Sequence, residues 1–245
     1  HLHNPEKGLR NILKNSKIGS KYFFRIYRSG SMKFYIIDYI RDFINIKDQK
    51  LFNKIFKTKY KIKNLKIDLS HENPLIHFHE MCVDNFFVPN LYLFNLKKFI
   101  KKFDKLGLKI EFNNRFKNYD HSVSKKDNTG ISLCFKKIRE TKIKNFKLIT
   151  DDQIKDIKYK EKYIKKTNFI LSKNLGKIKK INKTKKINLA IDLMFISQGY
   201  RIFKYYYSNR KKTEKLEKLN NLCKKYSSPK KIHMALQTLI RLAVV

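Results

Sequence analysis

The sequence predicts a mainly α-helical fold with an irregular segment of mixed structure in its middle. Several stretches repeat apolar residues three and four positions apart, which is the spacing of one face of a helix. Two of them begin with a capping residue followed by proline, a typical helix start. From about residue 103 to about residue 175 the pattern is no longer regular. Hydrophobic residues make up 42% of the 245 residues, so the chain has enough apolar side chains for a core.

The first part of the chain predicts a basic arm and a series of short helical stretches. Residues 1–20 interleave lysine and arginine with leucine and isoleucine, which indicates an arm that runs into a short helix. The amphipathic pattern continues through Tyr22–Arg28 until Ser29-Gly30-Ser31 interrupts it. Ser31 is a suitable N-cap for a helix over residues 32–46. Residues 48–69 are rich in lysine and predict a short helix followed by a loop.

Asn73-Pro74 is the clearest local signal in the sequence. Asparagine caps a helix N-terminus and proline is tolerated at the first helical position, so a helix is expected from here to Pro89. After it, residues 90–103 begin with an alternation typical of a strand. Residues 108–112 and 169–171 are also strand-like, whereas residues 113–130 are polar and irregular.

The longest regular stretch is KKINLAIDLMFISQGYRIFKYYY, residues 185–207. Its apolar residues form one wide stripe at helical spacing, which predicts a helix of the core. We expect it to pack in one cluster with the helices over 32–46 and 74–87. A lysine-rich run, residues 177–186, leads into it. Thr213 can cap the following helix, and Ser228-Pro229 precedes a last helix over 232–242.

The charge of the chain predicts a polyanionic partner. Lys and Arg number 58 against 20 Asp and Glu, a formal net charge of +38. Such an excess repels itself in an isolated protein, and bound phosphate groups would neutralise it. Positive charge is spread along the whole chain rather than over one helix face, which favours nucleic acid over a membrane surface. No apolar run approaches the roughly 20 residues of a membrane span, so no membrane association is expected.

The sequence offers no pattern typical of a cofactor, a metal or a catalytic centre. His71, His77 and His79 with Glu80 are close in sequence, but His77 and His79 are two apart and face different sides of a helix. The three cysteines are far apart and form neither a zinc motif nor a disulfide framework. There is no glycine-rich phosphate loop and no carboxylate cluster suited to two metal ions. We therefore expect neither a cofactor nor an enzymatic activity.

Four segments occur in a recognisable order. They are FRIYRSGSMKFYIIDYIRDFINI at 24–46, NPLIHFHEMCVDNFFV at 73–88, the lysine pair and apolar run of 185–201, and KKIHMA at 230–235. Their order and spacing resemble the S-seven family of small-subunit ribosomal proteins, of the bacterial and organellar type. In that family the corresponding parts are two helices with a glycine-lysine break, a helix that opens with Asn-Pro-Leu, a helix that opens with two arginines, and a basic tail with His and Met.

The resemblance has clear departures. The family's short hairpin, with its arginine pair and two glycines, is not recognisable, and an insertion occupies its place. Residues 176–182 are then expected to form the returning strand. The histidine and methionine of the tail are adjacent here, at His233 and Met234, whereas the family has a residue between them.

The resemblance implies a helical bundle with a protruding β-hairpin that binds the 3′ major domain of small-subunit rRNA. It divides the chain into a basic N-terminal arm (1–20), a single helical rRNA-binding domain (21–96 with 176–245) and a family-atypical insertion (97–175). Implied partners are neighbouring proteins of the small-subunit head, with mRNA and the E-site tRNA within reach. The implied role is structural: organising the head of the subunit during assembly and translation.

Ten residues are candidates for RNA binding. By position in the family pattern, Lys33 lies in the glycine-lysine break, Lys185 and Lys186 replace the paired arginines, and Lys230 and Lys231 lie in the tail. Charge and placement add five more candidates: Arg25, Arg28, Lys177, Lys179 and Lys180. Lysine lacks the bidentate fork of arginine, so these contacts are expected to position phosphates rather than read base edges.

Two alternatives remain beside a ribosomal role. One is a different lysine-rich subunit of an organellar assembly, since many such proteins share this charge. The other is an enzyme that acts on RNA, for which Asp151, Asp152 and Asp156 form the nearest acidic cluster. The abundance of Lys, Asn, Ile, Phe and Tyr indicates an A/T-rich genome such as that of an organelle. With the resemblance, this bias predicts a mitochondrial location.

Overall fold

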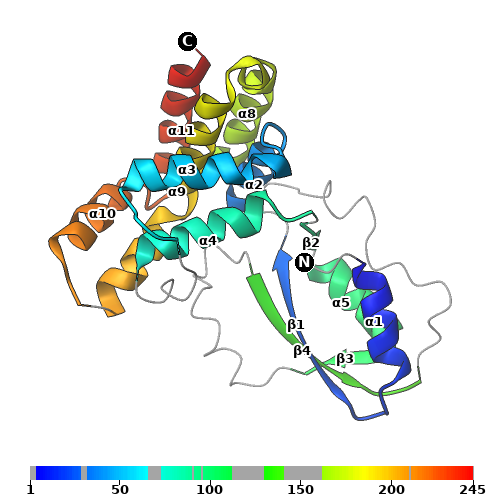
Figure 1. Ribbon diagram of the computed structural model, residues 1–245. Coiled ribbons are helices and arrows are strands. Elements are labelled where there is room, and N and C mark those ends of the chain that lie inside the picture. Colours follow the sequence, from blue (N-terminus) through cyan, green and yellow to red (C-terminus); the bar gives the residue numbers. More distant parts are fainter. Residues whose placement is uncertain are drawn as a thin grey trace. The chain divides into compact units, whose positions relative to one another are not determined.

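The computed structural model describes residues 4–28, 32–65, 73–89, 91–94, 96–111, 130–140, 162–209 and 211–244. Of these residues 69% are helical, and the rest of the regular structure is a small four-stranded sheet. The prediction of a mainly helical fold with a minor β component is therefore confirmed (Figure 1). The chain forms two compact units: a sheet unit of His1–Ser31 with Pro89–Lys158, and a helical unit of Met32–Val88 with Tyr159–Val245.

The helical unit is built around its longest helix, α9 (Lys183–Asn209). The other elements of this unit are α2 (Met32–Arg41), the 3-10 turn η1 (Ile46–Asp48), α3 (Gln49–Tyr60), α4 (Pro74–Phe86), α8 (Lys162–Lys180), α10 (Glu214–Lys224) and α11 (Pro229–Val244). Helix α9 packs against α2, α3, α4, α10 and α11, and α11 also packs against α8. The predicted core helix over 185–207 is thus the centre of the unit.

Aromatic side chains join the helices around α9. The ring of Phe78 on α4 contacts Phe56 of α3 at 5.8 Å between centroids, Phe195 of α9 at 5.7 Å and Phe203 at 6.5 Å. Ile36 and Ile37 of α2 are also fully buried. The three helices predicted to share one cluster therefore do so, because each turns its apolar stripe toward the same core.

The predicted capping residues start their helices as expected. Asn73 accepts a hydrogen bond from the Leu75 N–H at 2.9 Å, and Thr213 accepts one from Leu216 at 3.2 Å. Helix α2 ends at Arg41, earlier than the predicted residue 46. The reason is local: Asn45 begins a new turn, in which its side chain and that of Asp48 each bond the other's backbone N–H.

The sheet unit contains two helices and four strands. They are α1 (Pro5–Lys14), β1 (Lys21–Arg28), β2 (Leu93–Phe94), α5 (Leu96–Lys105), β3 (Leu108–Ile110) and β4 (Gly130–Lys137). The strand order is β2-β1-β4-β3, with β1 and β2 parallel and the other pairs antiparallel. Figure 1 shows α1 and α5 on the same side of β1 and β4. The core between these helices and the strands includes Leu9, Leu13, Phe99, Phe103 and Phe135.

The helix expected over Tyr22–Arg28 is wrong, since these residues form strand β1. Tyr22 and Ile26 are buried against α1 and α5, whereas Phe23 and Arg25 are exposed on the other face. This alternation has the period of a strand, and β1 hydrogen-bonds along its length with β4. The pairing partner lies far away in sequence, and its contribution outweighed the local pattern.

The strands expected at 169–171 and 176–182 are also wrong, because residues 169–171 and 176–180 lie in α8 and residues 181–182 form the turn that follows it. Thr167, Leu171 and Ile178 are buried in this helix at spacings of four and seven residues, as on one helix face. Strand β3 confirms the strand-like pattern at 108–112, and α1 and α3 confirm the short helices expected near the start and over 48–69. In the described part of the segment 90–103, Leu93–Phe94 is the strand, and α5 follows. The irregular stretch 113–129 lies outside the described residues.

The two compact units group the chain differently from the predicted domains. Residues 21–28 were expected in the helical domain, but their pairing with 130–137 places them in the sheet unit. Most of α8 was expected in the insertion 97–175, but its packing on α11 places it in the helical unit. Strand pairing and helix packing between distant segments decide these boundaries.

Candidate nucleic-acid interface

The corner between α8 and α9 is the most basic part of the described helical unit. Residues 162–186 contain ten lysines and no aspartate or glutamate. Helix α8 ends at Lys180 and α9 begins at Lys183. The side chain of Asn182 accepts a hydrogen bond from the Lys185 N–H at 2.8 Å and so caps the start of α9. We call the six lysines around this turn the lysine corner: Lys177, Lys179, Lys180, Lys183, Lys185 and Lys186.

Buried isoleucines on both sides of the turn direct these lysines outward. Ile178 of α8 and Ile187 of α9 are buried in the core of the unit. Five of the six lysines are consequently exposed, and Lys186 is half-buried. Lysines at the start of a helix oppose its dipole, while the free N–H groups there attract anions. The corner is therefore suited to bind phosphate groups.

The nearby carboxylates are already paired with lysines. Lys183 Nζ lies 3.2 Å from Asp48 Oδ1, and Lys59 Nζ lies 2.6 Å from Asp192 Oδ1. These two ion pairs hold α3 alongside the first turns of α9. Asp192 is the only carboxylate in the sequence of α9, and α3 has none. The surface formed by α3 and the lysine corner therefore keeps a large excess of positive charge.

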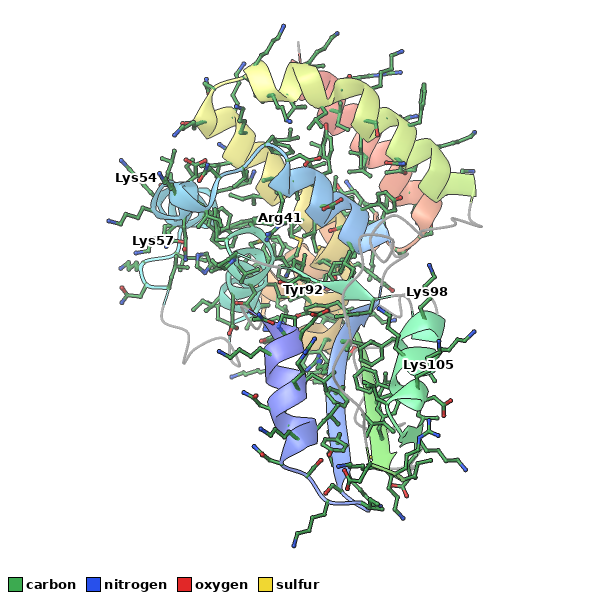
Figure 2. All side chains as sticks on the ribbon, turned by 90° about the vertical axis from the view of Figure 1, so that its right-hand side faces the viewer. Arg41, Lys54, Lys57, Tyr92, Lys98 and Lys105 are labelled. Carbon is green, nitrogen blue, oxygen red and sulfur yellow. The ribbon has the colours of Figure 1, made fainter. Side chains whose placement is uncertain are left out.

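Helix α3 extends the basic surface beside the corner. Lys50 and Lys54 are exposed on it, and Lys57 is half-buried. Figure 2 labels Lys54 and Lys57 along this helix. The prediction did not include them, although the spacing of lysines opposite Phe52 and Phe56 could have revealed a cationic helix face.

The structure brings five of the ten predicted residues together and separates the others. Lys177, Lys179, Lys180, Lys185 and Lys186 all belong to the lysine corner. Lys230 and Lys231 are exposed in the first turn of α11. A hydrogen bond of 2.7 Å joins Thr167 and His233, so the start of α11 lies beside the start of α8. At 1.5 Å per residue, the corner is then roughly 15 Å further along α8.

Three predicted residues have different surroundings. Lys33 is only 8% exposed, and its Nζ lies 5.2 Å from the centroid of the Phe34 ring, so its charge is inside the helical unit. Arg25 is exposed, but on strand β1 of the sheet unit. Arg28 ends that strand, and its side chain is outside the described part.

Helix α5 of the sheet unit is a basic surface that the predicted site residues did not include. Lys98, Lys101 and Lys105 are exposed, whereas Phe99 and Phe103 of the same helix are buried. Figure 2 labels Lys98 and Lys105 on α5. The repeat LKKFIKKFDK has the spacing of an amphipathic helix, so the sequence did contain this signal.

The described histidines stabilise helix packing. His79 Nε2 lies 2.8 Å from Asn53 Oδ1, and burial lowers the pKa of His79 to about 4. An amide oxygen can only accept, so the neutral ring donates from Nε2. Burial, with a smaller contribution from Lys166, also lowers the pKa of His233. His71 lies outside the described residues.

Within the described ranges, no three His, Cys, Asp or Glu side chains converge as metal ligands would. Burial raises the pKa of the Cys223 thiol to about 12 and that of Cys82 well above its usual value, so both thiols are protonated at neutral pH. Among the described helices, none has the length and apolar character to cross a membrane. Comparison of the chain with protein-family models, curated proteins and solved structures finds no match.

Proposed function

We propose that this protein is a structural, non-enzymatic subunit of the mitochondrial small ribosomal subunit. In this role it binds the 3′ major domain of the rRNA through the lysine corner. The observation that supports this most directly is the corner itself: six lysines without a carboxylate over residues 177–186, five of them exposed, at the start of the central helix. An exposed cluster of this charge is suited to neutralise several neighbouring phosphates and to release their counterions.

The arrangement of the helical unit gives further support. Three of the four segments that resemble the S-seven family, at 73–88, 185–201 and 230–235, lie in this unit and pack around or beside α9. Residues 32–46 of the first segment, 24–46, lie there as well, whereas its residues 24–28 form strand β1 of the sheet unit. The order of the four segments along the chain is the family's order. The proposal includes the family's partners: proteins of the subunit head, with mRNA and E-site tRNA nearby.

The chemistry of lysine limits what the corner recognises. A lysine ammonium is a compact point charge on a flexible stem and lacks the planar fork that reads guanine bidentately. The corner therefore fixes the position of the protein on folded RNA through its phosphates. Specificity for one rRNA domain then comes from the three-dimensional spacing of those phosphates.

The test compares two charge reversals of equal size. Lys185→Glu with Lys186→Glu changes the corner, and Lys224→Glu with Lys225→Glu changes an exposed pair at the end of α10. We expect the first variant to bind a transcript of the 3′ major domain at least about tenfold more weakly, with a salt slope smaller by about 1.4 to 1.8. The second variant should lose less than about threefold. Filter binding over a range of salt concentrations measures both values.

Circular dichroism shows whether the variants remain helical, which separates loss of binding from loss of folding. Equal weakening by the two charge reversals, or none by the corner variant, would remove the lysine corner as the site. A transcript of another rRNA domain is the control for specificity. Equal affinity of the unchanged protein for both transcripts would favour the alternative of a different lysine-rich subunit.

A further inference from the structure

The four-stranded sheet has one covered face and one face with exposed cations and an exposed ring. Tyr22, Ile26, Leu133 and Phe135 point to the covered face, where α1 and α5 pack on them. Because side chains alternate along a strand, Lys21, Phe23 and Arg25 of β1 point to the opposite face. All three are exposed.

The strand register places three lysines in one row across this outer face. Lys21 of β1 is opposite Lys136 of β4, and Lys136 is opposite Lys109 of β3. Neighbouring strands are about 4.8 Å apart, and like charges directly opposite each other destabilise a sheet. Glu111 pairs with Lys21 at 2.8 Å. The row as a whole keeps an excess of positive charge, which a bound anion would relieve.

Phe23 lies next to this row and is exposed. Its side chain is 62% exposed. Its register partner on β4 is Cys134, a small and buried residue. Lys21 and Arg25 lie two residues before and after it on the same face, roughly 6.6 Å away along the strand. A flat ring with cations on both sides combines the two contacts by which proteins hold unpaired nucleotides: base stacking and phosphate neutralisation.

We propose that this outer face binds a short segment of single-stranded RNA. Phe23 stacks on an unpaired base, and Lys21, Arg25, Lys109 and Lys136 contact the phosphates that flank it. A base within a duplex is already stacked on its neighbours, so only an unpaired base can lie flat on the ring. This site is in the sheet unit, separate from the lysine corner, and it does not depend on the ribosomal role proposed above.

The absence of tryptophan from the sequence allows a direct test. Phe23→Trp keeps a stacking ring and introduces a single tryptophan at the site, which can be excited selectively in the presence of the 14 tyrosines. Tyr205→Trp is the matched control, because Tyr205 of α9 is similarly exposed, at 53%, but lies in the helical unit and outside the lysine-rich stretch 162–186. We expect octauridylate to quench the emission of Phe23→Trp in a saturable way and to leave that of Tyr205→Trp nearly unchanged. A duplex RNA of the same length should quench neither.

Variants in the unlabelled protein test each contact separately. Phe23→Val keeps a β-branched residue in the strand but removes the ring, and it should weaken octauridylate binding about tenfold. Phe23→Tyr should retain the affinity. Arg25→Gln with Lys136→Gln should reduce the salt slope by about 1.4, which corresponds to two phosphates of a single strand.

Unquenched Phe23→Trp in the presence of octauridylate, or equal affinities of Phe23→Val and the unchanged protein, would overturn the proposal. Equal quenching by duplex RNA would show a general phosphate surface and would overturn it as well. Lys185→Glu with Lys186→Glu, introduced into Phe23→Trp, should leave the quenching intact. This last variant distinguishes failure of the sheet site from failure of the lysine corner.

Discussion

The helical unit and the sheet unit both have phenylalanine-rich cores, but they distribute their cations differently. In the helical unit, Phe78 is packed among rings of α3 and α9, and the lysines gather where α8 ends and α9 begins. In the sheet unit, Phe103 lies 5.0 Å from Phe24 and 4.9 Å from Phe135, and cations alternate with core residues along the strands. Side chains on one face recur about every 3.6 residues in a helix and every 2 residues in a strand. The local structure thus sets the spacing of the cations on each surface.

This difference has a consequence for binding. A helix corner offers charges on flexible stems and suits the phosphates of folded RNA. A sheet face offers charges at fixed spacings with a ring between them, and suits an unpaired base with its phosphates. One highly basic chain can therefore contain two surfaces of different selectivity.

The largest expected effect tests whether each core stabilises its own unit. Phe78→Ala and Phe103→Ala each remove a fully buried ring, which costs about 3–5 kcal/mol. We expect Phe78→Ala to accelerate amide hydrogen exchange in α4 and α9, and Phe103→Ala to accelerate it in α5, β1 and β4. Hydrogen exchange followed by mass spectrometry measures both. Loss of protection in both sets of elements from either variant would contradict two separately stabilised cores.

A smaller effect, through His79, concerns the helical unit. The pKa of His79 in the folded protein, about 4, is below the ordinary value of 6.5. The unfolded chain therefore binds a proton at His79 more readily than the folded protein does. The associated stability is present above pH 6.5 and is lost as pH falls toward 4. Between pH 7 and pH 5 we expect a loss of about 2 kcal/mol from the free energy of unfolding. Urea denaturation at several pH values, followed by helix content, measures it.

His79→Phe keeps an aromatic ring beside Phe52 and Phe56 and should abolish this dependence. His77→Phe is the control, since His77 is partly exposed and should leave the dependence in place. The described part of the sheet unit contains no histidine, so amide protection in β1 and β4 should change little over this range. A pH dependence that survives in His79→Phe would assign the effect to other groups.

The smallest expected effect compares one ion pair from each unit. Lys59 and Asp192 are each about one-third exposed, and a double-mutant cycle should give a coupling of about 0.5 kcal/mol. Lys21 and Glu111 are more exposed, so their coupling should be weaker, although each shifts the pKa of the other in the favourable direction. Raising the salt concentration should reduce both couplings. A larger coupling for Lys21 and Glu111 would show that the outer sheet face is less hydrated than its exposure indicates.

The sequence by itself determined the features that depend on near neighbours. Asn73, Thr213 and Ser228 each start a helix because the capping bond closes within three residues. The apolar stripe of 185–207 specified the central helix, and the lysine run specified the basic entry to it. Half of the predicted RNA-binding residues lie together for the same reason: they are neighbours in sequence.

Only the tertiary structure decided the features that depend on distant partners. Residues 21–28 form a strand because residues 130–137 pair with them, and no window around Tyr22 contains that information. The row of Lys21, Lys136 and Lys109 exists only through this register. Lys33 was expected to be exposed, but the packing of the helical unit buries it. Local hydrogen bonds and periodicity are encoded within a few residues, whereas strand pairing and burial are set by whichever distant segment completes them.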